Sequence, residues 1–350
     1  MAPAAGTGFA GASRAGTIAA VTIVPPANDA SRVRIAVVIP FYQEQRGILA
    51  RALASVLAQT GVSDVHIVIV DDSSPVAAEG ELRELGSLRF PVTLVRQRNA
   101  GPGAARNRGL ESLPSGTRYV AFLDSDDEWT GEHLARAVLA LSQGYDFYFA
   151  DHFQLGQTVS AFARARRIVP DEHPRLAEGE GLHAYAGDMF DQIVTGNVIG
   201  TSTVVFDRER FPQARFREEF LHAGEDYLCW IDLAVSGARF VFSARCEATY
   251  GSGVNVYSGA AGGTVQHLLR VQSELKYRKA TLRLYPTTRA QQRFLRERIA
   301  ELREAFIGDL AHMIREREPL PFRILRAQLV MDPLTFLAPA AVLKRRLSNP

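Results

Sequence analysis

Cysteine is scarce in this chain of 350 residues, which contains only Cys229 and Cys246. Two cysteines are too few for a disulfide framework or a four-ligand cysteine site for zinc, so a reducing compartment such as the cytosol is favoured. Cys229 lies within an apolar stretch, where a free cysteine usually behaves as a small hydrophobic residue. The cysteines therefore argue against a small secreted protein held together by disulfides.

Long hydrophobic runs are also missing. No stretch reaches the roughly 20 apolar residues that a membrane-spanning helix needs. Residues 1–32 are rich in Ala and Gly, and Arg14 is their only charge before Asp29. The apolar run 18–24 is short and ends at two prolines, which is untypical of a secretion signal. We expect a disordered tail over 1–32 and a cytoplasmic protein.

Charge of one sign is not in excess overall, because the formal net charge is only +2. This balance gives no reason to expect a nucleic acid as partner. The distribution is uneven, however. Residues 264–350 contain 17 Lys and Arg against 8 Asp and Glu, a balance of +9, whereas the preceding residues carry 23 against 30, or −7. A basic C-terminal part is compatible with peripheral contact with an anionic membrane, and equally with a solvated helical surface.

From Val33 onward, short β-branched runs alternate with helical stretches, which is typical of a mostly parallel α/β sheet. The expected strands share a short apolar run and a polar or acidic end; they are 35–40, 65–70, 92–95 and 119–123. Residues 48–59 predict the first helix, since their leucines and valines fall on one face. In open α/β sheets, ligands bind at the carboxyl ends of the strands, so a site is expected there.

The rest of the chain has a less regular pattern. We expect a β-rich run over 199–206, a helix over 225–235 and a helical C-terminal extension from Thr264 to Pro350. The domain organisation expected is a tail (1–32), two halves of an α/β domain (33–128 and 129–263) and the extension (264–350). Apolar residues recur at three- and four-residue steps from Leu295 to Met313, a pattern typical of a helix packed on its own domain.

Three carboxylates follow the fourth expected strand, in the order Asp124-Ser125-Asp126-Asp127. Such a cluster is unfavourable unless a cation or hydrogen-bond donors compensate the charge. Mg²⁺ and Mn²⁺ take oxygen ligands and share them readily with phosphates. Aspartate also favours turns and helix N-caps, which is the alternative for any one of the three. Glu128 stands where haloacid-dehalogenase-type phosphotransferases want a small or aliphatic residue, which disfavours that chemistry.

Two further segments suit an anionic nucleotide. Asp71 and Asp72 end the second strand, where a carboxylate can accept a uracil N–H or a ribose hydroxyl, although the segment is also a good turn. Residues 99–109 place glycines before a helix start and include Arg106, so that helix amides and a guanidinium would suit a diphosphate. Their spacing differs from that of a dinucleotide-binding fingerprint.

Glu225 and Asp226 open the helix expected over 225–235. Acidic residues at a helix start are stabilised by the helix dipole and are common without any catalytic role. An inverting glycosyl transfer, however, needs a carboxylate that takes the proton of the acceptor hydroxyl. Spacing alone leaves both readings open.

Taken together, the elements VVIPFYQ, VDDSSP, NAGPGAARNRGL, FLDSDD and GEDYLCW resemble glycosyltransferase family 2, whose members have the GT-A fold, over about residues 33–253. The resemblance implies a Rossmann-like, mostly parallel central sheet flanked by helices, with 33–128 as the nucleotide-sugar-binding half and 129–263 as the acceptor-binding half. It assigns Pro40, Tyr42, Asp71, Asp72, Asn99, Arg106 and Asp124 to the nucleotide-sugar donor. It assigns Asp126, with Asp124, to Mn²⁺ or Mg²⁺, and it makes Asp226 the catalytic base with Glu225 beside it orienting the acceptor.

At finer grain, the chain is similar to bacterial enzymes that add side-chain glucose in exopolysaccharide synthesis of the succinoglycan type. This implies a UDP-sugar donor and a lipid-linked oligosaccharide acceptor. Residues 251–263 look like a glycine-rich loop near the donor, and His222 and His267 are candidates for a third metal ligand, with a structural role the more common one for a lone histidine. The chain lacks the Gln-x-x-Arg-Trp element of processive synthases. A non-catalytic scaffold that binds nucleotide sugars is the alternative function.

Overall fold

All four strands expected in the first half form, and they are parallel. The computed structural model describes residues 21–23, 34–253 and 261–337, and in it these strands are β2 (Arg34–Phe41), β3 (Val65–Asp71), β4 (Val92–Arg96) and β5 (Thr117–Phe122). They are connected by α1 (Ile48–Leu57), α2 (Ala78–Leu85) and α3 (Pro102–Glu111). The spatial order β4-β3-β2-β5 changes direction between β2 and β5, and the crevice at such a point is where open α/β sheets bind ligands.

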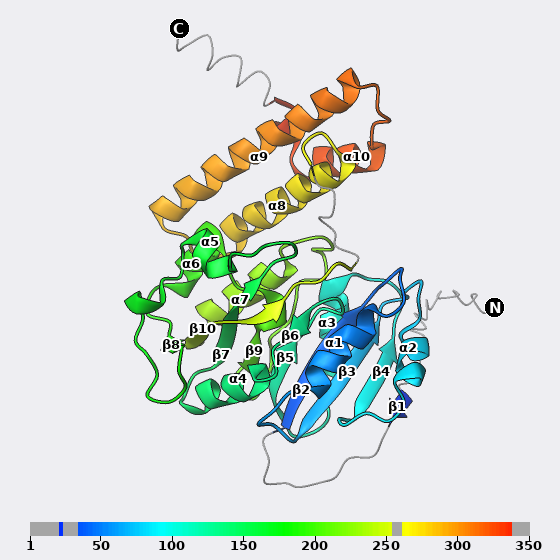
Figure 1. Cartoon of the computed structure of the whole chain (residues 1–350). Helices are drawn as coiled ribbons and strands as arrows, with labels where there is room; N and C mark the ends of the chain where they lie inside the picture. The colour runs from blue at the N-terminus through cyan, green and yellow to red at the C-terminus, as the bar shows by residue number, and fades with distance from the viewer. Residues whose placement is uncertain (1–20, 24–33, 254–260, 338–350) are drawn as a thin grey trace, which may run out of the picture.

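The second half continues the same sheet with mixed strand directions (Figure 1). Its strands are β6 (Glu128–Trp129), β7 (Phe147–Phe153), β8 (Leu182–Ala184), β9 (Val205–Asp207) and β10 (Phe240–Thr249). Its helices are α4 (His133–Ser142), α5 (Ala161–Ala165), α6 (Met189–Gly196) and α7 (Glu225–Val235). Strand β9 is antiparallel to both β5 and β7, so β5 and β7 run the same way and end at the same edge.

Both faces of the sheet are buried, because successive side chains of each strand point to opposite faces. In β2, Val38 belongs to the core on one face, with buried residues of α3, α6 and α7. Its neighbours Val37 and Ile39 belong to the core on the other face, with residues of α1, α2 and α4. The near-continuous apolar strands read from the sequence therefore reflect a sheet covered by helices on both sides.

The expectation of a tail without structure over 1–32 is wrong for three residues. Val21–Ile23 form β1, which pairs antiparallel with the edge strand β4. An edge strand offers unpaired N–H and C=O groups, and β-branched residues such as these favour an extended backbone. The remaining residues of that segment lie outside the described part of the chain.

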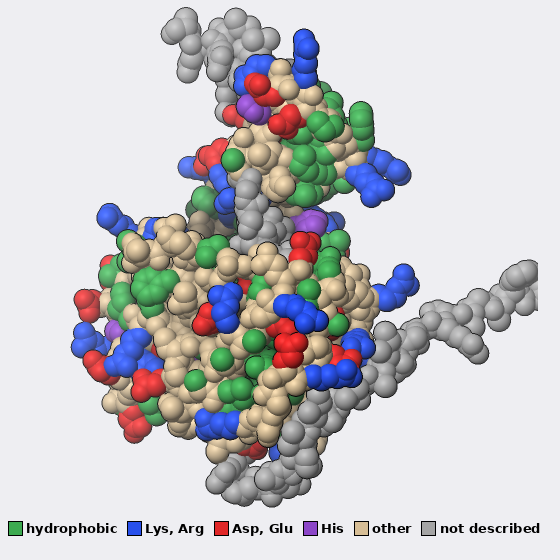
Figure 2. Space-filling view, turned by 45° about the vertical axis from the view of Figure 1, so that its right-hand side comes forward, with side chains coloured by type: hydrophobic (Ala, Val, Ile, Leu, Met, Phe, Trp, Pro, Cys, Tyr) green, Lys and Arg blue, Asp and Glu red, His purple; other side chains and the backbone are tan. Residues whose placement is uncertain are grey.

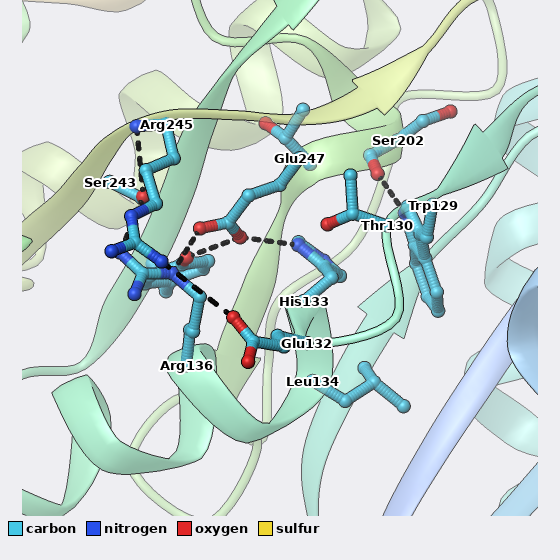
Figure 3. A network of polar contacts seen from close by, with 12 residues as sticks. Trp129, Thr130, Glu132, His133, Leu134, Arg136, Ser202, Ser243, Arg245 and Glu247 are labelled. Atoms are coloured by element: carbon cyan, nitrogen blue, oxygen red, sulfur yellow. Dashed lines mark hydrogen bonds and ion pairs between the residues drawn. The ribbon is translucent and has the colours of Figure 1, made fainter. Parts of the chain in front are cut away.

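A buried polar network holds β7 and β10 to α4 (Figure 3). The carboxylate of Glu247 accepts hydrogen bonds from His133 Nδ1 at 2.9 Å, Arg136 Nε at 2.6 Å and the Tyr148 hydroxyl at 2.6 Å. Arg136 Nη2 also donates to the Ser243 hydroxyl at 3.0 Å. Burial by itself would raise the pKa of Glu247, but the hydrogen bonds and the charge around it hold that pKa below its ordinary value.

Replacing Glu247 with glutamine should lower the free energy of unfolding by about 3 kcal/mol, because it leaves the buried Arg136 guanidinium without its counterion. In the wild type, the stabilisation that Glu247 provides should be present at neutral pH and should be lost as the pH falls below about 4.5. The folded pKa lies below the unfolded one, so the unfolded chain takes up the proton first. Urea denaturation at several pH values measures both effects.

Glu132→Gln is the matched control, since Glu132 is exposed and pairs with Arg245 at 3.7 Å on the surface (Figure 3). We expect a change below about 1 kcal/mol for this variant. Equal losses in Glu247→Gln and Glu132→Gln would contradict a dominant role for the buried network.

The C-terminal extension is helical as far as the structure describes it, and comprises α8 (Val265–Leu284), α9 (Arg289–Arg315), α10 (Phe322–Met331) and the 3₁₀ helix η3 (Pro333–Leu337). The apolar stripe of α9 is buried against α8, in a core that includes Leu302 and Phe306. The rings of Tyr227 in α7 and Tyr277 in α8 lie 5.3 Å apart, which joins the extension to the sheet domain. No helix in the described ranges is long and apolar enough to cross a membrane.

Candidate active site

The turn Asp124–Asp127 follows β5 at the carboxyl edge of the sheet, as its sequence predicts, and its three carboxylates take different positions. Asp127 is buried, whereas Asp124 retains 35% of its side-chain exposure. The backbone N–H of Asp127 donates to the Asp124 carbonyl at 3.0 Å, which closes the turn. A tight turn places Asp124 and Asp126 near each other at the strand end, where a ligand can reach them.

Asp127, which the sequence left without a role, is the structural member of the turn. Its carboxylate accepts the Ser202 hydroxyl at 2.5 Å and the Gly251 N–H at 3.0 Å. The Ser202 hydroxyl in turn accepts the Asp124 N–H at 3.0 Å, and the Ser202 carbonyl accepts Trp129 Nε1 at 2.5 Å. Asp127 thus fixes the turn to the chain segments that follow β10 and precede β9.

Asp126 lies against the glycines that follow β10. Its Oδ2 accepts the Gly253 N–H at 2.8 Å, and a Cβ atom on Gly251 would overlap the Asp126 carbonyl oxygen. Glycine is therefore required for this close approach. Burial raises the pKa of Asp126, and the charge of Asp124 raises it further. Two neighbouring carboxylates of this kind are stabilised as anions by a hard cation.

Arg106 connects the two acidic segments of the site. Its guanidinium donates to Asp124 Oδ1 at 2.7 Å and to Glu225 Oε1 at 3.0 Å, and its side chain is only 4% exposed. The Asp124 and Glu225 charges raise the pKa of Arg106 against the effect of burial. The sequence assigned Arg106 to the donor. The structure places it between the end of β5 and the start of α7, where it bridges Asp124 and Glu225.

Asp226 stands in the first turn of α7, beside Glu225. Its Oδ2 accepts the Thr201 hydroxyl at 3.2 Å, and its Oδ1 accepts the Tyr227 N–H at 2.8 Å. Burial raises the pKa of Asp226, whereas the Arg106 charge lowers it. Asp226 is partly accessible to solvent, while Glu225 is buried with Oε2 unpaired. Of these two residues, Asp226 is therefore the less buried.

Asp71 and Asp72, at the end of β3, organise the backbone on the donor side. Asp71 accepts the Ser74 and Ala78 N–H groups at 2.8 and 3.0 Å, so it caps the start of α2. Asp72 accepts the N–H groups of Ala100 and Gly101 at 2.9 and 2.8 Å, and also Gln97 Nε2 at 2.7 Å. Three of the roughly four acceptor positions of the Asp72 carboxylate are thus used within the chain.

The remaining donor candidates lie on a more open rim. Tyr42, after β2, is 37% exposed, Pro40 is half-buried, and Asn99, before α3, is exposed. Their positions at the ends of β2 and in the loop before α3 place them on the same edge of the sheet as Asp72 and Asp124.

The sequence analysis did not identify several residues of the site. The expected β-rich run over 199–206 is largely wrong, because residues 201–203 form a 3₁₀ turn and β9 begins only at Val205. The chain turns there because the Thr201 and Ser202 hydroxyls bind the carboxylates of Asp226 and Asp127. Three consecutive hydroxyl residues, Thr201 to Thr203, were the only local signal.

Tyr250 is a further addition to the site. Its ring stacks on His152 with centroids 4.7 Å apart, and its hydroxyl lies over Gly200, where a Cβ atom would overlap it. Burial raises the pKa of Tyr250, and the charges of Asp127, Asp124 and Asp226 raise it further. The Tyr250 side chain therefore lies among the carboxylates of the candidate site.

The histidine candidates lie in and beside the extension. His267 Nδ1 is 2.5 Å from Asp309 Oδ2, which links α8 to α9. Burial and the charge of Lys276 lower the pKa of His222. Within the ranges that the structure describes, no group of three or more His, Cys, Asp or Glu side chains could hold a metal ion. The carboxylates of Asp124 and Asp126 are oxygen ligands of the kind that Mg²⁺ and Mn²⁺ prefer. The loop segment 254–260 lies outside the described residues.

Comparison with known proteins agrees with this geometry. The family model described as "Glycosyl transferase family 2" matches residues 36–211. The succinoglycan biosynthesis protein ExoW of Rhizobium meliloti (strain 1021) is 35% identical over 243 residues, which cover 67% of this chain and 74% of that protein. The amylovoran biosynthesis glycosyltransferase AmsB of Erwinia amylovora is 29% identical over 68% of this chain and 76% of its own length.

Solved structures show the same fold at low sequence identity. S. aureus TarS (residues 1–349) in complex with UDP superposes with a TM-score of 0.54 and 17% identity, covering 88% of this chain and 87% of TarS. Mannosyltransferase PcManGT from Pyrobaculum calidifontis, in complex with GDP-Man and Mn²⁺, gives a TM-score of 0.53 with 16% identity over 92% of this chain and 89% of that one. The predicted GT-A fold, with a mostly parallel sheet flanked by helices, is confirmed.

Proposed function

Because the chain belongs to glycosyltransferase family 2, we propose that it transfers a hexose, with glucose as the expected sugar, from a UDP-sugar to a lipid-linked oligosaccharide. The chain is a glycosyltransferase of the exopolysaccharide type, as its membership and relatives show. The donor, the acceptor and inversion of configuration belong to the proposal.

The observation that carries the proposal is the position of Asp226 relative to Asp124. Arg106 bridges Asp124 to Glu225, so the end of β5 and the start of α7 lie side by side. Asp226, next in the chain, is held by Thr201 and remains partly accessible. A donor bound by the turn would therefore present its anomeric carbon on the side where Asp226 can receive a proton.

In the proposed reaction, Asp226 accepts the proton of the acceptor hydroxyl while that oxygen attacks the anomeric carbon. The bond from the anomeric carbon to the diphosphate oxygen breaks, and its electron pair leaves with UDP. The product carries a new glycosidic bond of inverted configuration. Glu225 would be a positioning residue, since it is buried and accepts a hydrogen bond from Arg106.

Mn²⁺ or Mg²⁺ would be held by Asp126 and Asp124, and when bound it supplies Lewis-acid stabilisation of the leaving diphosphate. The raised pKa of Asp126, caused by burial and by the charge of Asp124, supports this assignment. Asp72 and Asp71 fix the loop before α3 and the start of α2, so Asp72 would offer its remaining acceptor position to the base. Pro40, Tyr42 and Asn99 would line the nucleotide from the rim.

We further propose that the protein works in the cytoplasm, with peripheral contact between its basic C-terminal helices and the membrane that carries the acceptor. The relatives named for succinoglycan and amylovoran biosynthesis support a polysaccharide role. The second candidate is a non-catalytic scaffold. It follows only from the general point that a protein can bind a nucleotide sugar without transferring the sugar.

Thermal unfolding with a panel of nucleotide sugars, with and without Mn²⁺, tests the donor. A UDP-hexose at 100 times its Kd should stabilise the protein by about 2.7 kcal/mol, and more weakly without metal. Transfer to lipid-linked oligosaccharide acceptors tests the reaction. Stabilisation by GDP-sugars alone would overturn the UDP assignment. UDP-hexose binding that never yields product would favour the scaffold.

A further inference from the structure

In α10 and η3, polar side chains are buried and large apolar side chains are exposed, the reverse of the usual arrangement. Gln328, Asp332 and Thr335 are buried, and Gln328 Nε2 donates to the Thr335 hydroxyl at 2.6 Å. Large apolar side chains point outward instead; Val330 is 80% and Phe322 76% exposed. The exposed apolar residues on this outer face are Phe322, Leu329, Val330, Leu334 and Leu337. We call these five residues, with Arg323 and Arg326, the α10 face.

This inversion does not arise from loose packing. Gln272 of α8 donates to the Ile324 carbonyl at 3.0 Å and to Gln328 Oε1 at 3.2 Å. Lys279 donates to the Met331 carbonyl at 2.8 Å. Polar contacts on the inner side thus fix the orientation of α10. A contiguous set of outward apolar side chains held in this way marks an interaction surface.

The charges on the α10 face are all positive. Arg323 and Arg326 are exposed, and neither makes an ion pair or hydrogen bond within the described part of the chain. Asp332 is the only acidic residue in 322–337, and it is buried in ion pairs with Lys279 at 2.9 Å and Arg303 at 2.7 Å. Figure 2 shows hydrophobic side chains gathered on the extension with basic side chains beside them.

The sequence that follows adds to the same charge. Residues 338–350 contain Lys344, Arg345 and Arg346 and no acidic residue. Apolar side chains flanked by unpaired cations complement an anionic lipid surface, where the former enter the acyl boundary and the latter meet headgroups. A second copy of this chain fits less well, because two such faces would bring like charges together.

We infer that the α10 face binds the surface of an anionic membrane. The sequence pointed to the basic helices in general, but the apolar stripe of α9 is buried against α8. The α10 face, in contrast, combines exposed apolar side chains with Arg323 and Arg326, so α10 and η3 carry the contact. The extension stands over the sheet edge at which the candidate site lies (Figure 1). The benefit of membrane binding rests on the proposed function, because a lipid-linked acceptor lies in the membrane. The binding itself requires neither donor nor acceptor.

Co-sedimentation of the full chain with phosphatidylcholine vesicles, with and without phosphatidylglycerol, tests the inference. We expect binding to the anionic vesicles that weakens at high salt, and little binding to neutral ones. Arg323→Gln/Arg326→Gln should lower the partition coefficient about 30-fold. Leu329→Ser/Val330→Ser should lower it at least about tenfold. These two double variants remove different interactions, so a folding defect in one leaves the other decisive.

Arg289→Gln/Arg293→Gln, at the start of α9, is the matched control and should bind as the wild type does, since it removes equal charge outside the α10 face. The inference would be overturned if the control lost as much vesicle binding as the α10 variants, if neither α10 variant changed binding, or if the wild type did not bind. It would also be overturned if light scattering showed that the wild type is a dimer and the α10 variants are monomers. Transfer to a water-soluble acceptor should survive in the α10 variants, which separates this outcome from failure of the proposed reaction.

Discussion

Asp226→Asn should lower kcat by about 100- to 10,000-fold, the range that a general base contributes. The amide keeps the size of the side chain and accepts from Thr201, but it does not take a proton from the acceptor. KM for the donor should change little, since the donor is bound by other residues. In the wild type, activity should fall as the pH drops through the pKa of Asp226, which burial raises above the ordinary aspartate value.

Asp232→Asn is the control for this experiment. Asp232 lies on the same helix, pairs with Arg217 at 3.1 Å and accepts the Tyr285 hydroxyl, away from the turn at Asp124. We expect kcat within about threefold of the wild type for it. An Asp226→Asn enzyme with the kcat of this control would remove Asp226 from the reaction, and a loss confined to KM would make it a binding residue instead.

Asp126→Ala should lower transfer at least about 100-fold, because several kcal/mol of charge stabilisation by the metal are lost. A chelator should inactivate the wild type, and Mn²⁺ or Mg²⁺ should restore it. The variant should lose little thermal stability without donor, since it removes a half-buried carboxylate whose pKa burial and the Asp124 charge already raise, together with one hydrogen bond from the Gly253 N–H. Activity titrated with metal, together with thermal unfolding, provides both measurements.

Asp127→Asn provides the comparison within the same turn. It disturbs the contacts to Ser202 and Gly251, so we expect lower thermal stability with an unchanged metal concentration for half-activation. Chelator-resistant wild-type activity, or full activity in Asp126→Ala, would refute the metal assignment. If Asp127→Asn rather than Asp126→Ala shifted the metal requirement, the two roles would have to be exchanged.

The sequence determined the parallel half of the sheet and its functional edge. Each of those strands is a short β-branched run followed by polar residues, and this pattern depends only on neighbours in the chain. The same holds for the helix that begins at Glu225 and for the apolar stripe of α9, which the structure reproduces. The motifs at these strand ends were sufficient to identify the family and its fold.

Which side chains meet depends on the packing of distant segments. Arg106 and Glu225 are 119 positions apart, and Asp127 is 124 positions from Gly251, so no local pattern reports these contacts. The bridge that Arg106 forms between two carboxylates and the structural role of Asp127 are therefore visible only in the structure, whereas the donor contact of Arg106 stays a prediction. The exposure of the apolar residues of α10 could not be predicted from the sequence either, because it depends on the hydrogen bonds that hold Gln328 in the interior. Periodicity encodes where a helix or strand forms, whereas the partners of a charged or apolar side chain follow from the packing of distant segments.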